Sequence, residues 1–169
     1  MFVFDATPLI YLAKTDRLSL LDCLEFPCLI PERVHGEVVT TGLDAGYPDA
    51  RRIDQCVESG TFDVASAPDD ALFDRLSTNP NLSSADAAVL ALAANRQATA
   101  VMDEAYGRTV AEVEDIQTRG TAYLVLLLVR DGNLSTGDAK ETLEAMLDAG
   151  WYCQPDLYAT LFAKLDELE

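Results

Sequence analysis

Two aspartates follow short apolar runs, in places where a carboxylate can take part in catalysis. Asp5 comes directly after residues 2–4, and Asp103 comes directly after residues 99–102. Both runs are short and rich in bulky or β-branched residues, which is typical of buried strands. Ligands of open α/β sheets bind beyond the carboxyl ends of the strands. If these two strands are neighbours, Asp5 and Asp103 meet at one edge of the sheet.

A third acid, Glu37, belongs to a helix that we expect over residues 32–40. Val34, Val38 and Thr41 have the spacing of an inward-facing stripe. Glu37 is three residues after Val34, so it lies on this stripe or at its edge. A carboxylate in that position is unfavourable unless another group compensates its charge. The alternative is a slightly rotated helix, in which Glu37 faces solvent.

The fourth acid, Asp86, stands in the first turn of the most regular helical pattern of the chain, residues 83–94. This helix is rich in alanine and therefore thin enough to pack closely on a sheet. Ser83 and Asp86 have the spacing of a capping box, in which each side chain binds the other residue's backbone amide. Capping alone is thus a sufficient alternative reason for Asp86.

Together these four acids predict a binding site for a divalent cation. Carboxylates that are packed together raise each other's pKa and destabilise the fold unless a cation is present. Mg²⁺ and Mn²⁺ prefer oxygen ligands and keep waters for chemistry, including the displacement at a phosphoryl group. Simpler explanations also remain for the two acids at the strand ends. Asp5 could be only a turn residue, and Asp103 and Glu104 could be a pair of polar loop residues.

Strands and helices alternate up to about residue 118, which indicates βαβ units and a parallel sheet. In the first unit, Thr7 is the expected N-cap of a helix whose first turn contains Pro8. We expect one domain over residues 1–169, with an α/β core at 1–118 and a mainly helical extension at 119–169. The expected strands cover residues 2–4, 28–30, 61–64, 99–102 and, more weakly, 115–117. The expected helices of the extension cover residues 121–130, 136–148 and 155–168.

The chain is strongly acidic, with 29 Asp and Glu against 12 Lys and Arg and a net charge of -17. Self-repulsion of this size weakens a compact state in dilute buffer, whereas at ~1 M salt the Debye length falls to ~3 Å. We therefore expect a protein of a salt-rich, halophilic cytoplasm; an ordinary acidic protein is the alternative. The sequence has no basic run, so a phosphate substrate needs bound cations, local arginines or high salt to approach.

Composition also bears on metals, redox state and location. The 4 cysteines contain no C-x-x-C pair and the chain has only 1 histidine, so a zinc site has little support. We expect buried free thiols in a reducing compartment. The expected strand at residues 2–4 leaves no room for a signal peptide, and no apolar run approaches a membrane span. The sequence therefore predicts a cytoplasmic protein without a membrane partner.

Over nearly its whole length the chain resembles the PIN-domain ribonuclease family, most of all its prokaryotic branch related to the toxins of VapBC-type toxin–antitoxin pairs. The order and spacing of several motifs make this resemblance more specific than any single motif would. The similar segments are residues 5–14, 34–38, 84–93, 101–108 and 119–124.

The resemblance implies a three-layer α/β/α sandwich with a central parallel sheet of about four or five strands, followed by C-terminal helices. It implies a Mg²⁺- or Mn²⁺-dependent endoribonuclease that hydrolyses RNA phosphodiesters, with an antitoxin protein as a further expected partner. A homodimer is a separate expectation, which rests on the apolar helix at 121–130 and on Trp151 and Tyr152. The implied catalytic and metal-binding residues are Asp5, Glu37, Asp86 and Asp103. The implied supporting residues are Thr7 by hydrogen bonding, Glu104 as an extra ligand, and Arg108 and Arg119 at phosphates.

Two other functions remain open from the sequence. A phosphoaspartyl hydrolase would use Asp5 as a nucleophile, but that chemistry needs a well-placed lysine, and Lys14, Lys140 and Lys164 are poorly placed. A non-catalytic PIN-like interaction module would keep the acids and use the apolar helix at 121–130 as a dimer surface together with Trp151 and Tyr152. Burial of that helix and those aromatic residues in the core is the simpler expectation.

Overall fold

The centre of the fold is a five-stranded sheet in which every pairing is parallel, with the order β3-β2-β1-β4-β5. The structure is a computed structural model and describes residues 1–168. The strands are β1 (Phe2–Phe4), β2 (Cys28–Pro31), β3 (Asp63–Ala65), β4 (Thr99–Val101) and β5 (Thr118–Arg119). The first strand lies in the middle of the sheet, which explains why its residues are bulky and fully apolar.

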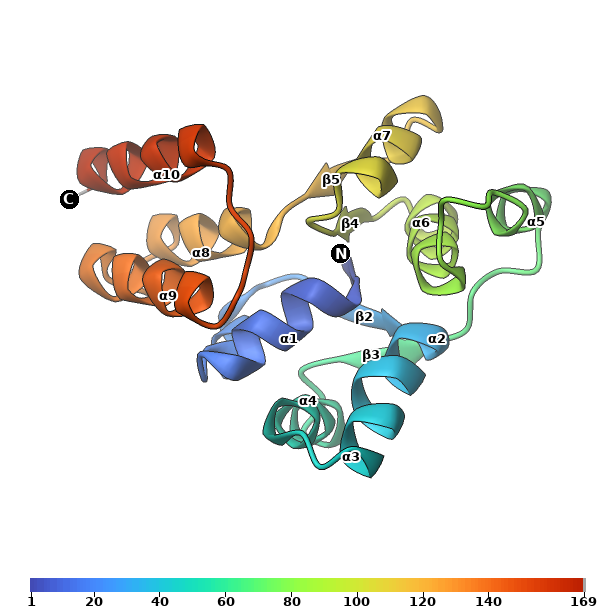
Figure 1. Ribbon diagram of the computed structural model, residues 1–169, viewed down its shortest axis with the longest axis horizontal. Helices are drawn as coiled ribbons and strands as arrows, with labels where there is room; N and C mark the ends of the chain where they lie inside the picture. Colours follow the sequence, from blue (N-terminus) through green and yellow to red (C-terminus); the bar gives the residue numbers. More distant parts are fainter. Residues whose placement is uncertain (169) are drawn as a thin grey trace.

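Helices flank this sheet, and the chain continues into a group of C-terminal helices (Figure 1). The predicted α/β/α class, with a parallel sheet of four or five strands, is therefore confirmed. Before the C-terminal group come α1 (Ala6–Lys14), η1 (Leu18–Cys23), α2 (Glu32–His35), η2 (Gly36–Thr41), α3 (Gly42–Asp44), α4 (Pro48–Glu58), α5 (Ala71–Ser77), α6 (Ser84–Arg96) and α7 (Ala105–Val113). The C-terminal group is α8 (Thr121–Arg130), α9 (Thr136–Asp148) and α10 (Pro155–Glu167).

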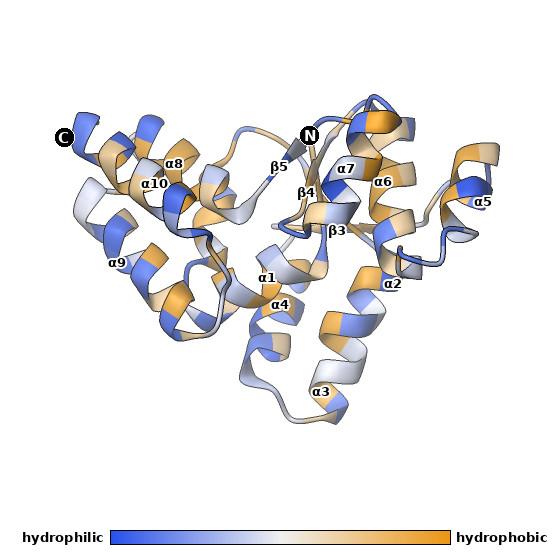
Figure 2. Cartoon of the chain, turned by 45° about the horizontal axis from the view of Figure 1, so that its top comes forward, coloured by the Kyte–Doolittle hydropathy of each residue, from blue (hydrophilic) through white to orange (hydrophobic). Residues whose placement is uncertain are grey.

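Helix α6 is the main packing element of the core. Every residue from Ala87 to Ala93 is buried, and α6 packs on β1, β2 and β4. The helix is coloured hydrophobic along most of its length in Figure 2. Its alanines let it approach the sheet closely, and this brings the N-terminal end of α6, with Asp86, toward the end of β1 that carries Asp5.

The start of α1 differs from the sequence expectation. The N-cap is Asp5, which has an extended backbone, and α1 begins at Ala6. Thr7 is therefore a residue of the first turn, and the prediction that it caps the helix was wrong. The Asp5 backbone N–H donates to the carbonyl of Val101 at 3.0 Å, so the residue is still held by the sheet when the helix begins.

The helix that carries Glu37 is longer than expected and contains a π-helical segment. α2, η2 and α3 follow one another without a break from Glu32 to Asp44, and η2 is the π segment. A π turn takes up more residues than an α turn. The inward position predicted for Thr41 consequently falls on Gly42: Thr41 is exposed and Gly42 is buried.

The edge strand β5 is also displaced from its expected place. It consists of Thr118 and Arg119 and pairs with Ala100 and Val101, whereas residues 115–117 were predicted to form it. Asp115 has a positive φ of 56°, which ends α7 in a tight turn. The strand can begin only after that turn.

The C-terminal helices bury most of the apolar side chains that could have formed a dimer surface. Leu124, Val125, Leu127 and Leu128 of α8 are buried, and so is Trp151. Tyr152 is 77% exposed, and Tyr123, Leu126 and Val129 of α8 are half-buried, so a smaller part of the alternative surface faces outward. The division into a core and a C-terminal extension stays a prediction. Among residues 1–168, no helix combines the length and the apolar character needed to cross a bilayer.

Candidate functional site

Asp5 is the most strongly perturbed acid of the candidate site. Its residue is only 5% exposed at the end of β1, and burial raises the pKa of its carboxyl from 3.8 to about 7. The amide of Ala6 acts in the opposite direction, while the negative charges of Asp86, Asp103 and Glu37 raise the pKa further. A carboxyl in this state resists ionisation and would gain most from a nearby cation.

The other three predicted acids, Glu37, Asp86 and Asp103, lie near Asp5, because their charges raise its pKa. Asp103 follows β4, and β4 pairs with β1 so that Val101 lies opposite Phe4. The two strands therefore end together, as the sequence predicted for neighbouring strands. The three other acids are close enough to Asp5 to raise its pKa. Within residues 1–168, however, no three His, Cys, Asp or Glu side chains are close enough to hold one metal ion in this arrangement.

Asp103 is held in one orientation by three hydrogen bonds. The backbone N–H of Thr121 donates to Oδ1 at 2.7 Å, and the Thr121 hydroxyl donates to Oδ2 at 2.6 Å. The indole Nε1–H of Trp151 donates to Oδ2 as well, at 2.9 Å. Thr121 is buried at the start of α8, so a rigid helix terminus fixes this carboxylate.

Gly120 lets Asp103 approach the chain before α8. A Cβ atom at Gly120 would lie 2.9 Å from Asp103 Oδ1 and 3.5 Å from Arg108 Nη1. The first distance is shorter than ordinary van der Waals contact, so a side chain here would displace the carboxylate. The two distances also place the guanidinium of Arg108 beside the Asp103 carboxylate.

Glu37 is more exposed than the sequence predicted. Its residue is exposed, while Val38 and Val39 next to it are buried. Partial burial of the carboxyl and then the charge of Asp86 nevertheless raise the pKa of Glu37. Glu37 thus lies at the rim of the site, and the π segment η2 carries it; such segments occur often at functional sites.

Asp86 caps its own helix, as the alternative reading of the sequence proposed. The Ser83 N–H donates to Asp86 Oδ2 at 2.9 Å, and the Asp86 N–H donates to the Ser83 hydroxyl at 3.0 Å. The capping box does not occupy the whole carboxylate, since Asp86 Oδ1 has no hydrogen bond within the described chain. Capping and metal binding are therefore compatible in this residue.

The structure also shows the surroundings of the two supporting residues predicted near these acids, Glu104 and Thr7. Glu104 is the N-cap of α7, and its two carboxylate oxygens accept hydrogen bonds from the backbone amides of Tyr106 and Gly107. Capping of α7 is by itself a sufficient reason for an acidic residue directly after Asp103, without a metal ion. Thr7 is half-buried in the first turn of α1, and no side-chain hydrogen bond of Thr7 is found within residues 1–168.

Sequence reasoning missed Thr121 and Trp151 as partners of the site. Both lie beyond the α/β core in sequence, 18 and 48 residues after Asp103. The glycine–threonine turn before the apolar helix was a signal for Thr121, because a threonine after an extended residue is able to bind neighbouring groups at a helix start. For Trp151 the sequence holds no comparable signal.

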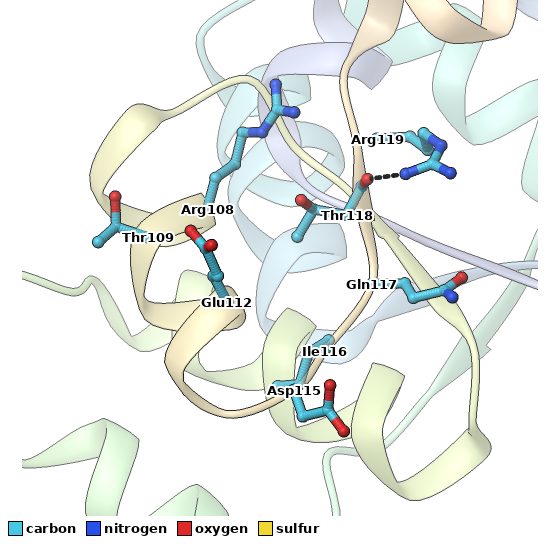
Figure 3. Close-up of a pocket in the computed structure, with 8 residues that line it drawn as sticks. All are labelled: Arg108, Thr109, Glu112, Asp115, Ile116, Gln117, Thr118 and Arg119. Atoms are coloured by element: carbon cyan, nitrogen blue, oxygen red, sulfur yellow. Dashed lines mark hydrogen bonds between the residues drawn. The ribbon is translucent and has the colours of Figure 1, made fainter.

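A polar hollow of about 420 Å³ lies beside Arg108, between α7 and the edge strand β5. In the view of Figure 3, the guanidinium groups of Arg108 and Arg119 lie at one end and Asp115 at the other. The Arg119 guanidinium donates to the Thr118 carbonyl at 2.8 Å and lies 5.0 Å from the centre of the Tyr123 ring. No carboxylate of residues 1–168 forms an ion pair with either arginine. The lining residues are Arg108, Thr109, Glu112, Asp115, Ile116, Gln117, Thr118 and Arg119.

The donor chemistry of the site fits a hard divalent cation. The four acids offer only carboxylate oxygens, which suit Mg²⁺ or Mn²⁺ and not a softer metal. Asp5 supplies a buried carboxyl that is destabilised when charged, and Asp86 and Asp103 each keep an oxygen with unused acceptor capacity. Because the carboxylates repel one another, a cation near them would offset an unfavourable concentration of negative charge.

Two comparisons with known proteins bear on the family of this chain. A comparison with curated proteins gives no match. A family model described as a PIN domain matches residues 1–167, which is almost the whole chain. Proteins of this family are generally nucleases, and divalent metals are typical of them. The chain therefore belongs to the PIN-domain family.

Proposed function

We propose that this PIN domain is a metal-dependent endoribonuclease that hydrolyses RNA phosphodiesters. The observation that carries the proposal is the buried Asp5 carboxyl, whose pKa is raised to about 7 by burial and by the charges of three other acids. Such a group is unfavourable for stability, and its position beyond a strand end of a parallel sheet is where ligands bind. A metal-binding role accounts for both facts.

The proposed metal ligands are Asp5, Glu37, Asp86 and Asp103, which would hold Mg²⁺ or Mn²⁺. The bound cation would activate water and offset the negative charge that develops on the phosphate. Asp103 contributes a carboxylate already fixed by Thr121, while the Asp86 oxygen that does not cap α6 remains for the ion. Glu37, at the exposed rim, is the ligand with most freedom to adjust.

The two arginines of the polar hollow support an anionic substrate. Arg108 lies beside Asp103 across Gly120, and Arg119 follows on β5. They give local positive charge in a chain whose net charge is -17. We propose that they contact RNA phosphates and that the protein works in a salt-rich medium, where ions screen the repulsion between RNA and the acidic surface.

The proposal extends to cellular context. The resemblance to VapBC-type toxins supports an antitoxin partner. A homodimer stays a separate proposal, for which Tyr152 is an exposed aromatic residue. A second hollow of about 390 Å³, lined in part by Leu43, Tyr47 and Arg51, offers apolar and basic groups for a protein partner. Cytoplasmic RNA is the proposed substrate, and a reducing cytoplasm would suit the four free cysteines.

The test is cleavage of an end-labelled single-stranded RNA with Mn²⁺, in KCl at about 1 M, where the Debye length is only ~3 Å. We expect cleavage by the wild type and its loss in Asp5→Asn and Asp103→Asn. Asp69→Asn is the matched control, since it makes the same charge change at an exposed residue outside the site. Full activity in the Asp5→Asn variant, or equal activity with excess chelator, would contradict the proposal.

One observation favours a second candidate, a non-catalytic PIN-like interaction module. Within residues 1–168, no three potential ligands are arranged closely enough to hold an ion. If the site does not close around a cation, the acids have no catalytic role and the protein acts by binding a partner. No cleavage of any of a set of unrelated RNAs, whether or not Mn²⁺ stabilises the protein, would support this second function over the first.

A further inference from the structure

The segment between α9 and α10 returns to the proposed metal site. In Figure 1 it runs along the side of the C-terminal helices that faces the sheet. It carries Trp151, which is only 5% exposed and whose indole N–H donates to Asp103 Oδ2 at 2.9 Å. Trp151 is the only tryptophan of the chain, so no other indole is available for this contact.

We propose that Trp151 is a positioning residue for Asp103, and that it directs the Asp103 oxygen Oδ1 to the metal ion. The inference rests on the proposed function and deepens it, because it assigns a role in the site to the C-terminal helices.

Counting the acceptor sites of Asp103 supports this assignment. An ionised carboxylate has about four lone-pair directions, two on each oxygen. Trp151 and the Thr121 hydroxyl both donate to Oδ2, whereas only the Thr121 amide donates to Oδ1. Oδ2 is therefore saturated, and the remaining lone pair belongs to Oδ1. A cation that binds Asp103 would be coordinated by that oxygen. Without the indole, each oxygen would accept one hydrogen bond and keep one free lone pair, so the carboxylate would no longer favour Oδ1.

The segment is fixed well enough to orient a carboxylate. Its backbone is tied to α9, because the Trp151 N–H donates to the Met146 carbonyl at 2.9 Å. It is also tied to α1, because the Tyr11 hydroxyl donates to the Gly150 carbonyl at 3.1 Å. Since α1 begins directly after Asp5, the segment connects the helix that follows one proposed ligand with the side chain of another.

Groups that orient a metal ligand from outside typically contribute ten- to a hundred-fold to metal affinity, as an order of magnitude. Trp151→Phe keeps an aromatic ring in the buried space and removes only the N–H donor. We expect the Mn²⁺ concentration that half-saturates thermal stabilisation to rise by about ten-fold or more in this variant. Tyr152→Phe is the matched control, because it changes the exposed neighbouring aromatic and should leave the Mn²⁺ response unchanged.

A purely structural role of Trp151 predicts a different result. It would lower the melting temperature without Mn²⁺ and leave the half-saturating Mn²⁺ concentration as in the wild type. A positioning role also predicts that saturating Mn²⁺ restores kcat toward the wild-type value, with the KM for RNA unchanged. An unchanged half-saturating Mn²⁺ concentration in Trp151→Phe would overturn the inference.

A second measurement needs no variant and remains decisive if Trp151→Phe does not fold. Mn²⁺ is paramagnetic and quenches a fluorophore only at short range. Fluorescence of the single tryptophan of the wild type should fall with the same half-saturation as the thermal stabilisation. Thermal stabilisation without quenching would overturn the inference and leave the proposed function intact. A wild type that shows no response to Mn²⁺ at all would overturn both.

Discussion

Replacing the buried acid at the end of β1 should change the pH dependence of stability in a defined direction. The folded-state pKa of Asp5 is raised from 3.8 to about 7. Below pH 3.8 the carboxyl is protonated in both the folded and the unfolded chain, so the group has no effect on stability. As the pH rises from 3.8 to about 7, the unfolded chain binds fewer protons than the folded one, so stability is lost over this range. In metal-free protein, Asp5→Asn should remove this loss.

The magnitude follows from the two pKa values. Each pH unit between them corresponds to about 1.4 kcal/mol. Above pH 8 the full difference amounts to about 4 kcal/mol, and the part lost between pH 5 and pH 8 amounts to about 2.5 kcal/mol. For a chain of this size, that part corresponds to a fall of roughly 5 to 10 °C in melting temperature. Burial, the largest cause of the raised pKa, persists at high salt, although the repulsion from the other acids is screened.

The assay is thermal unfolding with excess chelator at pH 5, 6, 7 and 8 in about 1 M KCl, where surface charges are screened. At each pH, the difference in melting temperature between the wild type and Asp5→Asn reports on Asp5 alone, because the other groups that titrate in this range are present in both proteins. We expect the melting temperatures to converge at low pH and Asp5→Asn to be the more stable at pH 8. Asp69→Asn should follow the wild type throughout. Parallel pH profiles of wild type and Asp5→Asn would refute the reasoning, since Asp5 would then ionise in the folded protein as easily as in the unfolded chain.

Three further changes test individual contacts. Ser83→Ala breaks the capping box and should lower stability by about 1 kcal/mol in urea unfolding, yet Mn²⁺ affinity should not fall, because it leaves the Asp86 oxygen Oδ1 in place. Gly120→Ala places a Cβ atom 2.9 Å from Asp103 Oδ1 and should weaken Mn²⁺ binding in calorimetry; equal affinity would show that the carboxylate can move freely. Arg108→Gln should raise the KM for RNA and reduce its salt dependence at unchanged Mn²⁺ affinity, whereas a change in kcat alone would contradict a phosphate contact.

The alternation of short apolar runs with helical patterns was enough to predict the parallel sheet. It placed Asp5 and Asp103 at strand ends but left open whether those strands are neighbours; the structure shows that β1 and β4 pair, so the two residues end at a common edge. Pattern reasoning failed where the backbone leaves regular geometry. The π segment η2 shifted the inward position from Thr41 to Gly42, since helical spacing assumes a constant number of residues per turn.

The finer features of the site depend on contacts between distant segments. Nothing in the sequence near Trp151 indicates that it reaches Asp103, since that contact arises from how α9 and α10 pack beside the sheet. Glu104 shows that pattern alone leaves the role of an acid open. It was predicted as an extra ligand, and its oxygens accept hydrogen bonds from backbone amides at the start of α7, an ordinary use of an acid at a helix N-cap. The ligand role stays a prediction.

Binding of a divalent cation by these carboxylates is the central claim, and diffraction from crystals grown with Mn²⁺ tests it most directly. Anomalous scattering locates Mn²⁺ independently of the protein atoms. We predict a peak at the carboxyl end of β1 and β4, within about 2.0 to 2.4 Å of oxygens of Asp5 and Asp103, the usual range for small hard cations. An anomalous map without a peak beside Asp5, in crystals that show Mn²⁺ elsewhere, would contradict it.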